Sequence, residues 1–332
     1  MNAHSLHAEI IRAPEALEAS CQGWWELWRR CSSATPFQMP PWLMAWWRCF
    51  APGELAAIAV WRGSRLVGLA PFYDEQSAQG HRLLPLGISV SDYLDVLIDP
   101  EGQESIGAAM IDAGRSVAWQ SWELEELHPD AHALALPCPD TLCCRRVDQS
   151  VCPVIELRGK PDLAGCVPAR RRRQLRRAQA AANRIGEATI TAAQSRPSYF
   201  LDHLFRLHAA CWQVRGEAGV LDHPAVRRFH REVLPILADH GVARCYLLDI
   251  GGIVAGAYYG FLDRGRAYAY IGGFDPEFAE QSPGSILIGH AIAEAIREGA
   301  SEFHFLRGRE SYKYSWGAVD RLNQKLVYSR VP

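Results

Sequence analysis

Three β-rich segments in the second half of the chain, separated by short glycine-containing turns, restrict the fold more than any other feature. The segments are ARCYLLDI, IVAGAYYGFLD and RAYAYIGGFD, and the turns are Gly251-Gly252 and Arg264-Gly265. Runs of β-branched and aromatic residues bounded by such turns are typical of antiparallel strands. The pattern therefore predicts a three-stranded meander.

A helix with well-marked ends follows the meander. Ser282 is a typical N-cap residue, Pro283 suits the first helical position, and Gly299 suits the residue after the C-cap. Isoleucines at every fourth position over residues 288–296 predict an apolar stripe, and SEFHFLRG predicts a further strand. A helix N-terminus reached from a strand favours an anion, although every unit of this kind has one.

The remaining segments alternate in the same way. Aromatic residues at helical spacing predict helices early in the chain, and later Gly-bounded apolar runs predict a hairpin and more strands. The predicted elements are a strand at LHAEIIR, a helix over 14–31, a helix over 42–50, a hairpin from 55, strand structure in LGISVSDYLDVLID, a helix over 105–118, a strand over 121–127, and helices at ARRRRQLRRA, 197–216 and 224–240.

The length of 332 residues favours two domains. We place the boundary in the Pro-, Cys- and Asp-rich loop of residues 128–150, which gives domains 1–150 and 151–332. The ten cysteines lack metal-ligand spacing and predict free thiols with no metal site. No apolar run is long enough to span a membrane and the N-terminus lacks a signal-peptide pattern, so we expect a cytoplasmic protein. The net charge of −2 argues against a dedicated DNA-binding protein.

The order meander, loop, helix, strand resembles the acetyl-CoA-binding core of the GCN5-related N-acetyltransferase (GNAT) superfamily. In that fold the strand before the helix pairs with pantetheine, and a Q/R-x-x-G-x-G/A loop wraps the pyrophosphate. Gln281-Ser-Pro-Gly284-Ser-Ile286 matches the first two fixed positions and departs at the third. The resemblance implies an acyl-CoA donor bound by Gln281, Ser282, Gly284 and Ser285.

A narrower resemblance covers most of residues 55–320. The passages VWRGSRLVGLAPFY, LGISVSDYLDVLIDP, YAYIGGFDPEFAEQSPGSILIGHAI and EFHFLRGRESYKYSWG are similar to CelD-type, or cellulose-biosynthesis-associated, acetyltransferases, which are related to Fem-type aminoacyl transferases. This resemblance implies an α+β fold of two tandem GNAT-like domains, each a mixed, mostly antiparallel sheet flanked by helices. The N-terminal domain would lie on the acceptor side, and the C-terminal domain would hold the acyl donor.

Charged and aromatic residues crowd the segment 307–316, directly after a predicted strand. An amine that attacks a thioester needs a proton acceptor and hydrogen-bond donors for the developing oxyanion. Glu310 is the candidate base. Lys313 matches the lysine of the Fem-type F-K-x-x-F pattern, which implies a place near the reacting carbonyl or the donor phosphate; a surface ion pair between these two side chains is the alternative. The candidates for substrate binding in this segment are Arg307, Tyr312 and Trp316.

The segment SDYLD of the first half concentrates polar groups on a predicted strand. We assign Asp92 and Tyr93 to acceptor binding and catalysis and Asp95 to substrate binding, with a buried hydrogen-bonding cluster as the alternative. The family usually has an aspartate in the strand before residue 307, where this chain has His304.

The segment ARRRRQLRRA holds six arginines in ten residues. On a helix, Arg170, Arg173 and Arg177 share one face, Arg172 and Arg176 lie on an adjacent face, and Leu175 is directed to the core. Three interpretations stay open: a solvated helix surface, binding of the phosphates of CoA, or binding of the acceptor stem of an aminoacyl-tRNA. Like charges at adjacent positions repel one another, which favours an anionic partner.

These observations predict an N-acyltransferase that moves an acyl group from acyl-CoA to the amine of a small molecule or peptide by direct attack in a ternary complex. Two alternatives stay open. One is a tRNA-dependent aminoacyl transferase of the Fem type, and the other is a catalytically inactive scaffold for polysaccharide assembly.

Overall fold

The computed structural model describes residues 5–77 and 80–331. The chain divides into two compact units, residues 1–150 together with 321–332, and Val151–Asp320. Residues 321–332, which the sequence analysis assigns to the second domain, therefore group with the first unit. Two strands, β9 (Leu142–Glu156) and β15 (Val319–Arg330), continue from one unit into the other.

The first unit contains two groups of strands with a shared apolar core. Its further elements are β1 (Leu6–Ile11), α1 (Pro14–Ala19), α2 (Cys21–Arg30), η1 (Pro36–Gln38), α3 (Pro40–Phe50), β2 (Glu54–Leu55), β3 (Ala57–Arg62), β4 (Arg65–Ala70), β5 (Phe72–Ser77), β6 (Gly80–Pro85), β7 (Leu97–Ile98), α4 (Gln103–Gly114), β8 (Ser121–Leu127) and η2 (His132–Ala135). One group has the antiparallel order β1-β3-β4-β7. The other has the order β2-β5-β6-β8-β15, in which β6 runs parallel to β8.

The second unit is built on one mixed sheet with the strand order β10-β11-β12-β13-β14-β9. Its elements are η3 (Leu163–Gly165), α5 (Ala169–Ile185), β10 (Ala188–Ala192), α6 (Pro197–Gln213), η4 (Val220–Asp222), α7 (Pro224–Asp239), β11 (Ala243–Ile250), β12 (Ile253–Asp263), β13 (Arg266–Phe274), η5 (Pro276–Gln281), α8 (Pro283–Arg297), β14 (Glu302–His304) and α9 (Ser311–Ser315). The strands β10 to β13 are antiparallel, and β13 and β14 are parallel.

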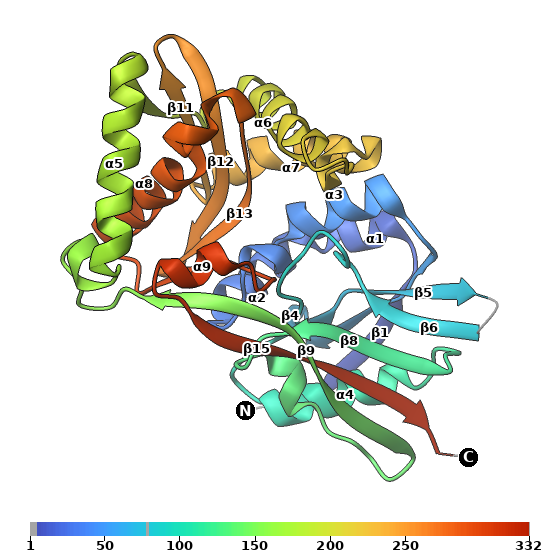
Figure 1. Cartoon of the computed structure of the whole chain (residues 1–332). Coiled ribbons are helices and arrows are strands. Elements are labelled where there is room, and N and C mark those ends of the chain that lie inside the picture. Colours follow the sequence, from blue (N-terminus) through green and yellow to red (C-terminus); the bar gives the residue numbers. More distant parts are fainter. Residues whose placement is uncertain (1–4, 78–79, 332) are drawn as a thin grey trace. The chain divides into compact units, whose positions relative to one another are not determined.

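Glycines let helices approach both faces of this sheet closely (Figure 1). A Cβ on Gly256 would meet Leu287 of α8 at 2.9 Å, and a Cβ on Gly273 would meet the backbone nitrogen of His208 in α6 at 2.4 Å. Gly256 pairs with Phe274 across the sheet, so the two residues face the same side. Gly273 precedes Phe274 on the same strand and therefore faces the opposite side. Helices α5 and α8 therefore cover one face, and α6 covers the other with α7 against it. Within the described ranges, no helix is long and apolar enough to cross a membrane.

The predicted meander and the helix after it are confirmed. Strands β11, β12 and β13 follow one another as predicted, and α8 begins at Pro283 and ends at Arg297. Ser282 is the N-cap residue, but its φ is 50°, and its side chain forms no capping hydrogen bond. A capping hydroxyl normally requires the extended conformation at this position, so the left-handed Ser282 leaves the helix start without a side-chain cap.

Two predictions about the first unit's irregular segments are wrong. Residues 86–90 form turns and 91–96 are irregular, and only the two-residue strand β7 follows, because Gly87 and Ser89 adopt left-handed φ values of 89° and 71°. The segment 128–150 is not a continuous loop, because β9 begins at Leu142. The polar residues of this strand are mostly exposed, and so the strand lacks the apolar alternation that would have predicted it.

In the second unit, the strand predicted at SEFHFLRG is shorter than expected, because only three residues form β14.

Candidate functional site

A cavity of about 450 Å³ follows the edge of β13 in the second unit. The pairing of β13 with β14 extends from Arg266 to Tyr268 and stops there. All six residues of 269–274 line the cavity. Because successive side chains of a strand point to opposite faces, contact with six consecutive residues means that the cavity runs along the backbone edge. One side of it therefore lies next to α8 and the other next to α6.

The start of α8 forms one wall of this cavity. Ser282, Gly284 and Ser285 line the cavity, and Gln281 is buried beside them but is not a lining residue. The N–H groups of Ser285 and Ile286 donate back to the Ser282 carbonyl, at 2.9 and 3.2 Å. The Gly284 N–H has no acceptor among the residues that the structure describes. This uncapped first turn can therefore donate to an anion, which the helix dipole also favours.

Arg171 of α5 reaches the same wall, although the sequence analysis did not single it out. Its Nη2 donates to Ser285 Oγ at 2.9 Å, and its guanidinium carbon lies 4.2 Å from the ring centroid of Trp316. Burial lowers the pKa of Arg171, and within the described part of the chain no acidic side chain opposes that change. The wall thus presents a partly desolvated positive charge without a compensating carboxylate.

A sequence signal for Arg171 does exist. Arg171 precedes Leu175, Ala178 and Ala182 at intervals of four, seven and eleven residues, and these three side chains form the buried stripe of α5. A charged residue on a buried stripe is unusual unless it has a partner or a ligand. The helical spacing places the other five arginines on two adjacent polar faces, and Arg171 alone continues the apolar stripe.

Lys313 holds the loop after β14 together. Its side chain is buried, and Nζ donates to the carbonyl oxygens of Leu306, Arg307 and Gly308 at 3.1, 2.6 and 3.2 Å. The carbonyls converge in a loop where Leu306 and Gly308 have left-handed φ values of 60° and 111°. Glu310 Oε2 lies 2.9 Å from the same nitrogen, and its side chain is 57% exposed. Neither Lys313 nor Glu310 lines the cavity, and their catalytic roles stay predictions.

The other candidates of this segment have separate positions. Tyr312 lines the cavity, and Trp316 is fully buried beneath Arg171. Arg307 is partly buried in the loop that Lys313 holds. His304 Nε2 lies 2.9 Å from Glu302 Oε2, and the imidazole ring packs against Tyr268 with centroids 5.0 Å apart. Of the three candidates Arg307, Tyr312 and Trp316, Tyr312 therefore has the most direct access to a ligand in the cavity.

Asp92 and Tyr93 of the first unit lie in the loop before β7, not on a strand. Tyr93 is buried, and its ring packs edge-on against Phe37 and His128. Asp92 is partly buried, and its backbone carbonyl accepts a hydrogen bond from Asn323 Nδ2 at 3.2 Å. The loop is thus fixed by packing within its own unit, and the acceptor role of these residues stays a prediction.

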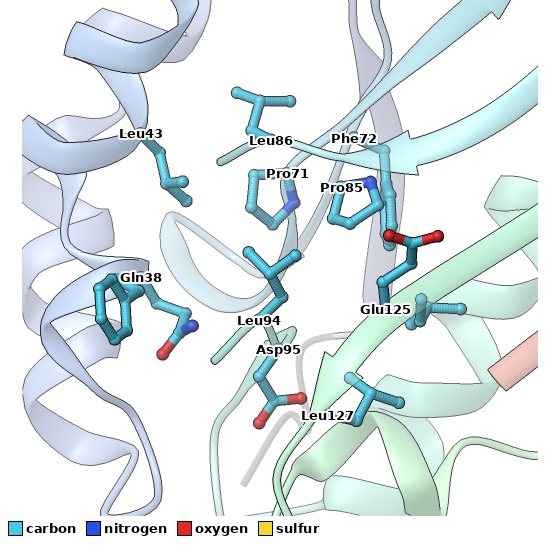
Figure 2. Close-up of a pocket in the computed structure, with 12 residues that line it drawn as sticks. Gln38, Leu43, Pro71, Phe72, Pro85, Leu86, Leu94, Asp95, Glu125 and Leu127 are labelled. Carbon is cyan, nitrogen blue, oxygen red and sulfur yellow. The ribbon is translucent and has the colours of Figure 1, made fainter. Parts of the chain in front are cut away.

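Asp95 occupies a buried position in the same loop. Its carboxylate accepts backbone N–H groups from Val96, His132 and Ala133 at 2.8, 2.8 and 2.9 Å. Burial raises the pKa of Asp95 to about 7, and the three N–H donors oppose this rise. Figure 2 shows Asp95 beside a small cavity lined mainly by leucine and proline side chains. That cavity measures about 10 Å³, enough for one water molecule and too small for an acyl acceptor.

The remaining arginines of α5 form a charged surface. Arg170, Arg173 and Arg177 are exposed, and Leu175 is buried, as the helical spacing predicts. Arg177 and Arg184 line a second hollow of about 420 Å³, which shares Ser282 with the first cavity. The ion pairs found in the described part of the chain include none of the arginines of α5, whereas many other arginines are paired.

A family model identifies the second unit. Residues 169–314 match the model described as an acetyltransferase (GNAT) domain, and this span contains Arg171, β13 and the start of α8. The segment is therefore a GNAT-type acetyltransferase domain, and the protein is an enzyme of the acyltransferase class. No curated protein matches the sequence, and the described residues contain no cluster of three or more His, Cys, Asp or Glu that could hold a metal ion.

Solved structures resemble the chain over nearly its whole length. FemX has a TM-score of 0.67 at 11% identity, with 92% of this chain and 95% of FemX covered. L-PGS from Bacillus licheniformis has a TM-score of 0.60 at 13% identity, with 95% and 91% covered. A tandem GNAT protein from the clavulanic acid biosynthesis pathway has a TM-score of 0.50 at 15% identity, with 97% and 98% covered. The predicted α+β fold of two tandem GNAT-like domains is confirmed, and FemX shares this fold.

Proposed function

We propose that the protein is a CelD-type N-acyltransferase that moves an acyl group from acyl-CoA to an amine by direct attack in a ternary complex. A CoA donor would place the reaction in the cytoplasm. The observation that carries the proposal is the uncapped start of α8, which opens onto a cavity along the unpaired edge of β13.

The α8 side of the cavity suits the diphosphate of CoA. The Gly284 N–H, the Ser285 hydroxyl and the Arg171 guanidinium all lie at this wall. Together they combine backbone donors, the positive end of a helix dipole and a full positive charge. A linear pantetheine chain would continue along residues 269–274, where the strand edge offers backbone donors and acceptors to an amide-containing ligand.

Direct attack is favoured over an acyl-enzyme because the cavity offers no activated nucleophile. Cys211 is the one cysteine among the lining residues. Its Sγ donates to the Phe274 carbonyl at 2.9 Å and accepts from the Phe274 N–H at 3.1 Å, and burial raises the pKa of the thiol. A thiol held in this way is mostly protonated at neutral pH and is a poor nucleophile.

A substitution at Gly284 tests the donor site. A Cβ there would lie 3.7 Å from Phe274, so a side chain fits without a clash. We expect Gly284→Asp to abolish the rise in melting temperature that CoA or acetyl-CoA produces, because the new carboxylate would occupy the position of a phosphate. The fold should be retained, since aspartate in the first turn of a helix is favourable.

Ser198→Asp is the matched control. Ser198 follows Pro197 in the first turn of α6, as Gly284 follows Pro283 in α8, and its side chain is exposed. This variant should keep the full CoA response. Equal CoA stabilisation of wild type and Gly284→Asp would remove the start of α8 from the donor site.

Aminoacyl transfer from tRNA is the second candidate function, and the unpaired arginines of α5 favour it. Arg170, Arg173 and Arg177 are exposed on one helix, and Arg177 lines the hollow next to Ser282. If they bind an acceptor stem, retention of charged tRNA on the protein should fall steeply between 50 and 200 mM salt, by a factor on the order of 10 or more for a few phosphate contacts. CoA binding should change much less over the same range. Binding of neither donor would support an inactive scaffold.

A further inference from the structure

The side of the cavity next to α6, which we take as the acceptor side, is aromatic and positively charged. On the α6 side, the lining consists of Cys211, Trp212 and Arg215, next to Tyr270 of β13, whose ring packs against His230 of α7. No aspartate or glutamate is among the residues that line the cavity on either side. A bound ligand therefore meets aromatic surface and positive charge, with no carboxylate to attract a second ammonium group.

Arg215 lies in the turn directly after α6 and differs from three arginines of α6 and α7. Arg206, Arg227 and Arg231 form ion pairs with Asp275, Asp222 and Asp202. Within the described residues, Arg215 forms no such pair. Its guanidinium carbon lies 5.1 Å from the ring centroid of Trp212, and the side chain is exposed. A guanidinium held on an aromatic ring keeps its planar fork free for a carboxylate.

The wall that carries Arg215 is fixed in place by hydrogen bonds. Trp212 Nε1 donates to His208 Nε2 at 3.0 Å, and His208 is buried. Burial lowers the pKa of His208 to about 4, so the imidazole is neutral and can accept this bond. Cys211 ties the same turn of α6 to the Phe274 backbone in both directions. The aromatic platform under Arg215 is therefore rigid rather than an adaptable surface.

We infer that the acceptor is a small apolar or aromatic amine that carries a carboxylate, as an amino acid does, and that Arg215 binds this carboxylate on the α6 side of the cavity. The inference rests on the proposed function, which places the acyl donor on the α8 side. A positive cavity also lowers the pKa of a bound ammonium group, which raises the share of the free amine that attacks the thioester. The amine nitrogen forms the new amide bond, the carbon–sulfur bond breaks, the CoA thiolate leaves, and the amine proton is lost to solvent.

The test uses the full chain, acetyl-CoA as donor and thiol release as the assay. The acceptors are leucine, methionine and phenylalanine, each paired with its α-carboxamide. We expect kcat/KM to be at least about tenfold higher for the acid than for the amide, because a charge-assisted bond to Arg215 is lost in the amide. In Arg215→Gln, KM for the acids should rise at least about tenfold while the amides change little.

Three controls make the result specific. Arg231→Gln removes an exposed arginine that is paired with Asp202, and it should keep the wild-type preference. Arg215→Lys should retain part of the preference, and Arg215→Gln should keep the full CoA-induced rise in melting temperature. Comparing acid-to-amide ratios between variants cancels the intrinsic difference in amine pKa.

Equal activity on acids and amides, or a preference that persists in Arg215→Gln, would overturn the inference while leaving the donor proposal intact. CoA stabilisation without thiol release for any of these amines would also overturn it. If CoA itself fails to stabilise the protein, the donor proposal fails first and this inference falls with it.

Discussion

Lys313 has two predicted roles: it stabilises the loop after β14, and it takes part in catalysis. Its Nζ is surrounded by three backbone carbonyls and Glu310, and its side chain is buried. Removing the ammonium leaves those carbonyls without their donor, so we expect Lys313→Met to lower the free energy of unfolding by about 2–4 kcal/mol. Urea denaturation measures this, and Lys160→Met, at an exposed lysine, should change it by less than about 0.5 kcal/mol.

The same variant separates the structural role from the catalytic one. If Lys313→Met unfolds as the wild type does but loses thiol release, Lys313 acts near the reacting carbonyl or the donor phosphate, as the Fem-type pattern implies. At the residue scale, the sequence predicts a candidate site in residues 307–316 from their charged and aromatic residue types, and the function of this site stays a prediction. It could not predict which side chains the loop turns inward, because that depends on the left-handed backbone of Leu306 and Gly308.

The contact between α6 and β13 depends on one glycine. A Cβ on Gly273 would lie 2.4 Å from the backbone nitrogen of His208 and 2.7 Å from the Leu207 carbonyl carbon. Backbone cannot yield as a side chain can, so Gly273→Ala should lower the free energy of unfolding by about 2 kcal/mol or more. Gly284→Ala, where the nearest atom would be 3.7 Å away, is the control in the same urea titration. A Gly273→Ala protein as stable as this control would contradict the close packing.

Elements with strong local signals could be predicted from sequence, and elements set by distant contacts could not. The meander and α8 carry their own turn and end residues, so both were predicted with nearly correct bounds. The turns of residues 86–96 contain apolar residues that resemble a strand. Their conformation instead depends on Trp42 and Trp46, which donate to Ser91 Oγ and the Ile88 carbonyl from α3. The free edge of β13 likewise depends on where β14 ends.

Two buried histidines make the stability of the protein depend on pH. Burial lowers the pKa of His208 to about 4 and that of His230 to about 3. Below pH 6.5 the unfolded chain binds protons that the folded chain does not, so the free energy of unfolding falls as the pH decreases from about 6.5 to 4. The loss amounts to about 3 kcal/mol for His208 alone.

Urea denaturation between pH 7.5 and 5 measures this dependence. His230→Phe should remove about half of it, because a phenyl ring fits among Phe229, Tyr259 and Tyr270 without a titrating group while His208 still titrates. An unchanged slope in this variant would show that other groups, such as the carboxylates, dominate the acid response.

Strand β15 completes the first unit. Residues of β15 pair with β8 from Gln324 to Ser329, and Leu326 and Tyr328 enter the apolar core of that unit. The ribosome therefore synthesises residues 151–320 before it synthesises the strand that completes the first unit. During synthesis the acetyltransferase domain can reach its native state first, and the first unit has to wait until β15 has been synthesised.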